Sequence, residues 1–319
     1  SQSQQGRVGP ALVTLDAQAD ALATLPRAAR QPWFSTRCYL LHRADRLVEC
    51  AQALADVIRF AADAEDGPEL CTTLANRSIL LSSLGRFAQA RVDAERAAEV
   101  LGGLGDAGGV HGGNVHLALG YALTGLGLLA PAAAAVDRAA QAFGTIGEPW
   151  VAIAANARAS VHLLAGEVDA AEAALGVPPA APAYVAARHH LLRSRIAQRR
   201  GEDPALALSR GHAALATAPD ATAALQLEGE AAHQSPAGRR GATLALLARR
   251  ARRLQQFALA ARLRWYRVQA LLDAGRVAAA ARACHALQCS HAVPSDWLPA
   301  ACGALADQVQ RRAAQADSR

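Results

Sequence analysis

Methionine and lysine are both absent from this chain of 319 residues, and aromatic side chains make up only 4% of it. The formal net charge of +6 therefore rests on arginine alone, which we attribute to a coding bias rather than to nucleic-acid binding. No apolar stretch reaches the length of a membrane span without a charged residue or a glycine or proline break. The alternation of β-branched and aromatic residues that indicates strands is also missing. These absences argue against a membrane-spanning helix and against a β-rich fold.

Alanine dominates the hydrophobic residues, which make up 52% of the chain. Alanine has the highest helix propensity, and its small side chain lets neighbouring helices approach closely. This composition predicts an all-α fold of many packed helices. The six cysteines include no CxxC pair, and we expect mostly buried, reduced thiols in a cytoplasmic protein.

One short pattern recurs along the chain: an arginine, a largely apolar stretch, and a turn residue eight positions after the arginine. The turn residues follow one another roughly every 35 to 42 residues, a period typical of helical-hairpin repeats. Glycine at such a position ends a helix because it adopts the left-handed conformation at little cost. The pairs are Arg37–Asp45, Arg77–Gly85, Arg158–Gly166, Arg193–Gly201 and Arg267–Gly275, and Gly127 and Gly238 are expected turns without the arginine.

Small residues recur at fixed places in the expected hairpins. Ser78, Gly120 and Ala159 lie in the middle of first helices, and Ala90/Ala97 and Ala132/Ala139 are alanine pairs seven apart in second helices. In these positions the chain resembles the tetratricopeptide repeat family. Over roughly residues 30–290, the resemblance implies a right-handed superhelix (α-solenoid) of about seven helix-turn-helix repeats, with a helix at each end.

The expected repeats share one continuous core, so we predict a single superhelical unit. Residues 1–30 are expected to form a capping helix near residues 11–25, residues 31–290 the repeats, and residues 291–319 a last helix over residues 295–314. The chain begins without methionine, and we expect it to be a segment of a longer protein or a processed one.

The resemblance also implies a role for asparagine. In long-period members of the family, an asparagine in the first helix lines the concave groove and clamps the backbone of a bound peptide. That role falls on Asn76 and, at differing offsets from the turn, on Asn114 and Asn156.

The recurring arginines occupy a position where the family usually has leucine. A guanidinium group cannot be buried unpaired without a large penalty. The arginines therefore either form a ladder along the groove that favours an acidic partner, or extend to its edge and pair within the chain. If the arginines form a ladder along the groove, the residues that line it are Arg77, Arg158, Arg193 and Arg267.

A strongly basic stretch covers residues 231–272, which contain no acidic residue. It predicts a basic surface formed by Arg249, Arg250, Arg252, Arg253, Arg262 and Arg264. Such a surface could dock an acidic protein segment or remain a solvated helix face. Nucleic acid is the weaker alternative because no nucleic-acid-binding motif accompanies the stretch.

Signatures of catalysis are missing from the sequence. There is no Walker A, HExxH or GxSxG motif, and His189, His190 and His212 lack a placed carboxylate or nucleophile. The single GxGxxG string, at residues 103–108, lies in a glycine-rich stretch that we interpret as a loop between repeats. The group Cys284, His285, Cys289, His291 and Cys302 has unsuitable spacing for zinc. We predict no enzyme activity, no metal and no cofactor.

These features predict a non-catalytic module that binds a protein or peptide segment, with a homodimer as a further possibility. We expect it to be the sensory or regulatory region of a larger bacterial signalling protein, because its last helix resembles the connector that precedes GGDEF-type diguanylate cyclases. Two alternatives stay open. One is the helical-repeat region of an ATP-dependent transcription activator of the maltose-regulator type, and the other is a stand-alone adaptor.

Overall fold

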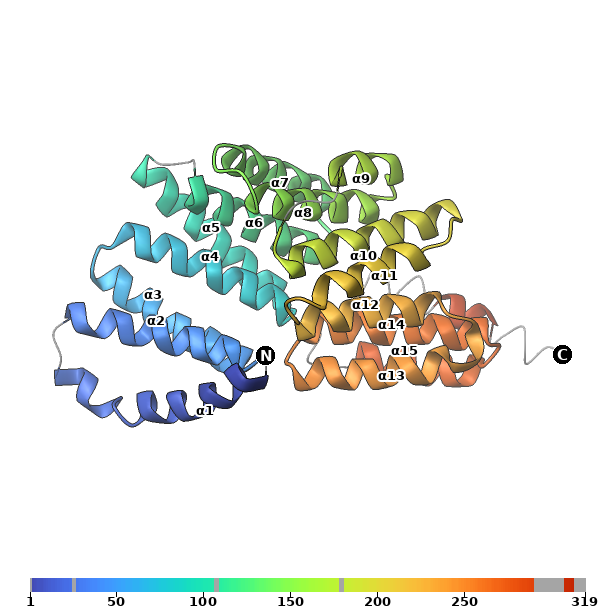
Figure 1. Cartoon of the computed structure of the whole chain (residues 1–319), viewed down its shortest axis with the longest axis horizontal. Helices are drawn as coiled ribbons and strands as arrows, with labels where there is room; N and C mark the ends of the chain where they lie inside the picture. Colours follow the sequence, from blue (N-terminus) through green and yellow to red (C-terminus); the bar gives the residue numbers. More distant parts are fainter. Residues whose placement is uncertain (1, 25–26, 106–108, 178–180, 290–306, 313–319) are drawn as a thin grey trace.

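The computed structural model describes residues 2–24, 27–105, 109–177, 181–289 and 307–312 (Figure 1). Within these ranges the regular structure is helical, and no residue lies in a β-strand. The elements are α1 (Gln2–Asp16), η1 (Asp20–Thr24), α2 (Arg27–Arg43), α3 (Leu47–Asp63), α4 (Gly67–Ser83), α5 (Phe87–Leu104), α6 (Gly109–Gly125), α7 (Leu129–Gly144), α8 (Trp150–Ala165), α9 (Val168–Leu175), α10 (Ala183–Arg200), α11 (Ala205–Leu215), α12 (Ala221–Gln234), α13 (Ala237–Arg253), α14 (Phe257–Asp273) and α15 (Val277–Gln288). None of the described helices is both long and apolar enough to cross a membrane.

The helices form consecutive hairpins, from α2–α3 through α14–α15, and each packs against the next along the chain (Figure 1). The first helices of successive hairpins also contact one another, from α4–α6 through α12–α14. These first helices therefore form an inner layer, whereas second helices such as α5 and α7 lie on the outside. This arrangement confirms the all-α helical-repeat solenoid predicted from the sequence.

The predicted turn glycines adopt the left-handed backbone that the pattern requires. Their φ angles lie between 69° and 83° at Gly85, Gly127, Gly166, Gly201 and Gly275. The turn residue Asp45 also has a positive φ, of 56°.

The turn predicted at Gly238 is wrong, because this glycine lies inside α13. The chain instead breaks at Ser235 and Pro236, both in extended conformations. Proline has no N–H to donate and fixes its own φ, so it starts the new helix at Ala237 without a glycine.

Close helix packing depends on the small residues singled out in the sequence. Ala90, Ala97 and Ser78 are fully buried, and the Ser78 hydroxyl donates a hydrogen bond of 2.7 Å to the Ala90 carbonyl across the α4–α5 crossing. At two further crossings the missing Cβ of a glycine makes room for an aromatic ring. A Cβ on Gly113 would lie 2.1 Å from the Phe143 ring, and one on Gly125 would lie 2.0 Å from the Phe87 ring.

The superhelix curves until distant repeats touch. The side-chain oxygen of Gln255, in the turn between α13 and α14, accepts a hydrogen bond of 2.7 Å from the backbone N–H of Val48 on α3. Phe257 packs against the buried cluster formed largely by α2 and α3, and α14 contacts α4. The inner face of the superhelix is therefore closed on one side by its own C-terminal repeats.

The ends of the chain differ from the sequence prediction. The helix expected near residues 11–25 ends at Asp16 in the structure and is followed by the short helix η1. Helix α2 then begins at Arg27, inside the segment expected to be a cap. The helix predicted over residues 295–314 lies mostly outside the described residues, of which residues 307–312 are helical.

Candidate binding sites on the inner face

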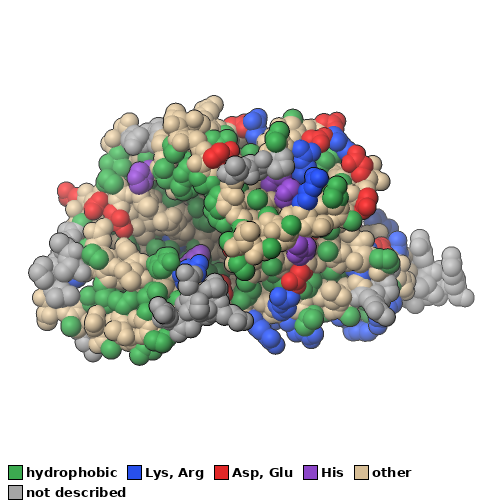
Figure 2. Space-filling view, viewed as in Figure 1, with side chains coloured by type: hydrophobic (Ala, Val, Ile, Leu, Met, Phe, Trp, Pro, Cys, Tyr) green, Lys and Arg blue, Asp and Glu red, His purple; other side chains and the backbone are tan. Residues whose placement is uncertain are grey.

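A cavity of about 510 Å³ opens between α2, α3 and α4. We call it the inner cavity; in Figure 2 the surface is hollowed between the N-terminal hairpins and the later repeats. Its polar lining includes Tyr39, His42, Thr72, Asn76 and, from the closing turn, Gln256. A space of this size is typical of small-molecule sites, and it could equally hold side chains of a bound peptide.

The three predicted groove asparagines have different environments. Asn76 is exposed and lines the inner cavity. Asn156 is only 2% exposed, and its Nδ2 donates a hydrogen bond of 3.1 Å to the Val185 carbonyl, so it ties α8 to α10. Asn114 is half-buried on α6 and does not line the inner cavity. The structure therefore leaves Asn76 as the one of the three that is placed for a ligand in this cavity.

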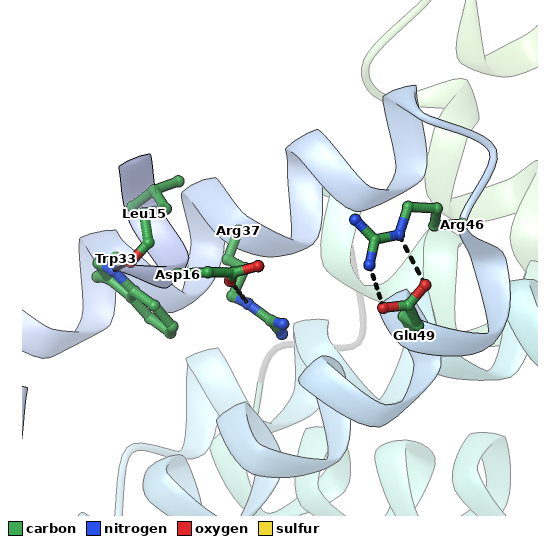
Figure 3. Close-up of polar contacts among 6 residues, drawn as sticks. All are labelled: Leu15, Asp16, Trp33, Arg37, Arg46 and Glu49. Carbon is green, nitrogen blue, oxygen red and sulfur yellow. Dashed lines mark hydrogen bonds and ion pairs between the residues drawn. The ribbon is translucent and has the colours of Figure 1, made fainter. Parts of the chain in front are cut away.

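Most of the recurring arginines pair within the chain. Arg37 and Arg193 contact carboxylates 21 residues earlier, Asp16 and Glu172, at 2.8 Å each. The same spacing recurs in Arg158, which lies 3.0 Å from a carboxylate oxygen of Asp137. Figure 3 shows the Arg37–Asp16 pair between α2 and α1, with Arg46 and Glu49 forming a separate local pair. In each 21-residue pair, the arginine joins a first helix to the preceding helix of the chain.

Arg77 pairs with a carboxylate that is itself buried. Its Nε and one terminal nitrogen donate hydrogen bonds of 2.6 Å each to the two carboxylate oxygens of Asp93, on the second helix of its own hairpin. The Asp93 side chain is 7% exposed and that of Arg77 is 22% exposed. Arg77 therefore lies in the seam between α4 and α5 while its neighbour Asn76 faces the inner cavity. Arg267 is half-buried on α14.

The predicted basic surface divides into two parts. Arg249, Arg250, Arg252 and Arg253 are exposed at the end of α13, where Arg250 pairs with Glu228; basic side chains gather along this helix in Figure 2. Arg264 is half-buried on α14, close enough to Arg252 for the two charges to repel. Arg262 belongs elsewhere, because it interacts with groups of α10 and α12 on the inner face.

Those groups form a second site that the sequence did not reveal, which we call the arginine cluster. It consists of Arg188 and Arg195 from α10, Glu230 from α12, Arg262 and Tyr266 from α14, and Tyr121 from α6. Arg195 Nε donates a hydrogen bond of 2.8 Å to Glu230, and the Tyr266 hydroxyl donates one of 3.2 Å to the same oxygen. Gln234 Nε2 donates to the other Glu230 oxygen at 3.2 Å.

Burial and mutual repulsion set the charges of the arginine cluster. Burial, together with the positive charges of Arg195 and Arg188, lowers the pKa of Arg262 to about 10, so Arg262 is still cationic at neutral pH. Burial also lowers the pKa of Arg188. Burial raises the pKa of Glu230, but the charge of Arg195 and its hydrogen bond outweigh this effect and hold that pKa below its usual range. The site is therefore ionic, with Glu230 as an anion held by Arg195.

Arg188 differs from the other members of the cluster. Its Nε is shielded from solvent and has no hydrogen-bond acceptor among the described residues. Sequence reasoning missed it, although Arg188 precedes the turn glycine Gly201 by the same number of residues as Arg262 precedes Gly275. That shared offset from the turn places both on the same part of a first helix.

The described cysteines carry free thiols. Cys38, Cys50, Cys71 and Cys284 are buried, and Cys289 is exposed beside His285. Among the described residues, no group of three or more histidine, cysteine or acidic side chains is placed to hold a metal ion. His291 and Cys302, from the cluster considered in the sequence, lie outside the described residues.

Comparison with protein-family models finds no family that matches this chain. A search of curated proteins likewise finds no significant match. The resemblance to tetratricopeptide repeats therefore rests on the turn residues, the small residues within first helices and the alanine pairs alone.

Proposed function

We propose that this chain is a non-catalytic binding module that takes an acidic peptide or protein segment along its inner face. The observation that carries the proposal is the inner cavity, which the fold leaves open between three helices and lines with polar groups such as Asn76 and Thr72. A groove on the inner layer of a solenoid offers a bound segment several successive helices at once. The arginine cluster, farther along the same layer, favours an acidic occupant.

Selection of peptides from a random display library on the purified chain tests the proposal. We expect enriched peptides to bind about tenfold or more weakly to the Asn76→Ala variant, because it removes an amide that pairs with peptide backbone. Gln89→Ala is the matched control, since it removes an exposed amide from the outer helix α5. Unchanged binding to Asn76→Ala, or a selection that enriches no peptide, would contradict the proposal.

The place of the module in a larger signalling protein stays a prediction. Binding on the inner face would pull the repeats together and could change the curvature of the superhelix, which suits a sensory region. The sequence of the full-length gene tests whether the module belongs to a larger signalling protein. A cyclase, DNA-binding or kinase domain after Arg319 would support the regulatory role, and a stop codon there would favour the stand-alone adaptor.

A further inference from the structure

We propose that the arginine cluster is an anion subsite in which Arg188 binds a carboxylate of an acidic peptide. This inference rests on the proposed function, since it concerns the occupant of the same inner face. Arg188 and Arg195 lie two helical turns apart on α10 and therefore point to the same side, where Arg262 from α14 and Tyr121 from α6 face them. Helices from three separate hairpins thus direct cationic and hydroxyl groups at one place.

The internal acceptor of the cluster is already occupied. Glu230 accepts hydrogen bonds from Arg195, Tyr266 and Gln234 and is 1% exposed. The carboxylate of Asp220 accepts a hydrogen bond of 2.7 Å from the Ala223 N–H as the N-terminal cap of α12. Neither carboxylate satisfies Arg188.

The hydrogen-bond donor of the cluster that lacks an acceptor among the described residues is the Nε–H of Arg188. Its Nε–H is removed from water without gaining an acceptor, and a buried donor in that state costs free energy. The nearby charge of Arg195 adds repulsion. An incoming anion would relieve both effects, so the folded protein holds a preorganised donor for a negatively charged group.

A carboxylate fits this donor. The guanidinium group presents its Nε–H and a terminal N–H side by side, which matches the two oxygens of a carboxylate, as the Arg77–Asp93 pair in this chain shows. The cluster is built from first helices, which form the inner layer of the superhelix. We therefore assign the subsite to a glutamate, aspartate or terminal carboxylate of a peptide segment.

Thermal unfolding with defined probes tests the assignment. The probes are N-acetylated tetraglutamate, its uncharged counterpart N-acetylated tetraglutamine, and sodium phosphate, each compared with sodium chloride at equal ionic strength. Tetraglutamate is expected to raise the unfolding midpoint of the unmodified chain, because a ligand that binds only the folded state stabilises it. Tetraglutamine is expected to leave the midpoint unchanged.

Substitution of Arg188 separates a binding role from a structural one. In sodium chloride, Arg188→Met should unfold at the same temperature as the unmodified chain or higher, since it removes a buried unpaired donor while keeping the bulk of the side chain. The same variant should lose the response to tetraglutamate, with affinity reduced about tenfold or more in calorimetric titration. Arg249→Met, an exposed arginine on α13, should respond like the unmodified chain.

Three results would overturn the assignment. A lower midpoint of Arg188→Met in sodium chloride, with the response to tetraglutamate retained, would make Arg188 a structural residue. Stabilisation by phosphate but not by tetraglutamate would exclude a peptide carboxylate as the occupant. No response to tetraglutamate, while selected peptides still bind in an Asn76-dependent manner, would remove this subsite and leave the proposed function standing.

Discussion

The amide side chain of Gln255 accepts a hydrogen bond from the backbone N–H of Val48, and the two residues lie 207 positions apart in the sequence. This contact joins the turn between α13 and α14 to α3. It closes the inner face and brings Gln256 into the lining of the inner cavity. The shape of the candidate site therefore depends on a contact between the two ends of the superhelix.

Glycine substitutions at two turns measure the contribution of that contact. Gln255 and Glu65 both have φ of 54°, a strained value for a residue with a side chain. Glu65→Gly should raise the free energy of unfolding by about 0.5–1 kcal/mol by releasing the strain. Gln255→Gly releases the same strain but loses the bond to Val48, so its net change should be about 1 kcal/mol less favourable. Urea denaturation checks both values, and equal stabilisation by the two variants would show that the closing bond contributes nothing.

Removal of Asp93 should be far more damaging than removal of Asp137. Asp93→Ala leaves the enclosed guanidinium of Arg77 without its partner, and we expect a loss of about 3 kcal/mol in the free energy of unfolding. Asp137→Ala breaks a pair whose side chains are 47% and 44% exposed, and should cost less than about 1 kcal/mol. Chemical denaturation of the two variants compares them, and similar losses would refute the distinction between seam and surface pairs.

Alanine at Gly125 should disrupt the crossing of α6 with the preceding hairpin. The added Cβ would lie 2.0 Å from the Phe87 ring, so the ring or the helix must move, at a cost of about 3 kcal/mol. Gly103→Ala is the control, because a Cβ there meets no atom within 4 Å and should stabilise α5 by about 0.5–1 kcal/mol. Thermal unfolding midpoints that shift in the same direction for both variants would argue against the packing described for Gly125.

Acid should destabilise the fold partly through His189. This side chain is 1% exposed, and burial with the nearby charges of His190 and Arg193 lowers its pKa to about 4. The unfolded chain binds a proton at this residue below about pH 6.5, whereas the folded chain does so only near pH 4. The stabilisation is therefore complete above pH 6.5 and is lost as the pH falls towards 4, by up to about 1.4 kcal/mol per pH unit.

Urea denaturation at a series of pH values measures this effect. His189→Leu should flatten the dependence between pH 6.5 and 4, although the pKa values of His116, His190 and His233 are also lowered by burial and retain part of it. His212→Leu, which makes the same substitution at an exposed histidine, is the control variant. An unchanged slope in His189→Leu would contradict the assigned pKa.

The repeat architecture could be predicted because its determinants are local. A turn glycine needs only its own backbone conformation, and Gly85, Gly127 and Gly166 adopt it. The turn at Gln255 was not predicted, because glutamine, unlike glycine, is not a residue type that indicates a positive φ. The turn predicted at Gly238 was wrong because glycine also occurs inside helices, as Gly238 does in α13.

The candidate site could be predicted only in part. Asn76 was found because it lies at a position defined by the turn of its own hairpin. The arginine cluster was missed because Tyr121, Arg188 and Arg262 come from three hairpins, and only the curvature of the superhelix brings them together. The 21-residue spacing of Asp16–Arg37 and Glu172–Arg193 was present in the sequence and would have indicated internal pairing.

The Nε–H resonance of Arg188 in the ¹⁵N-labelled protein tests the binding of an acidic segment on the inner face most directly. This resonance can be assigned by its absence in Arg188→Met, and its hydrogen is shielded from solvent in the free protein. We expect it to move downfield on titration with N-acetylated tetraglutamate, as a donor does when it gains a charged acceptor, and to stay in place with tetraglutamine. Saturable binding of tetraglutamate that leaves this resonance unmoved would place the ligand elsewhere and contradict the anion subsite at Arg188.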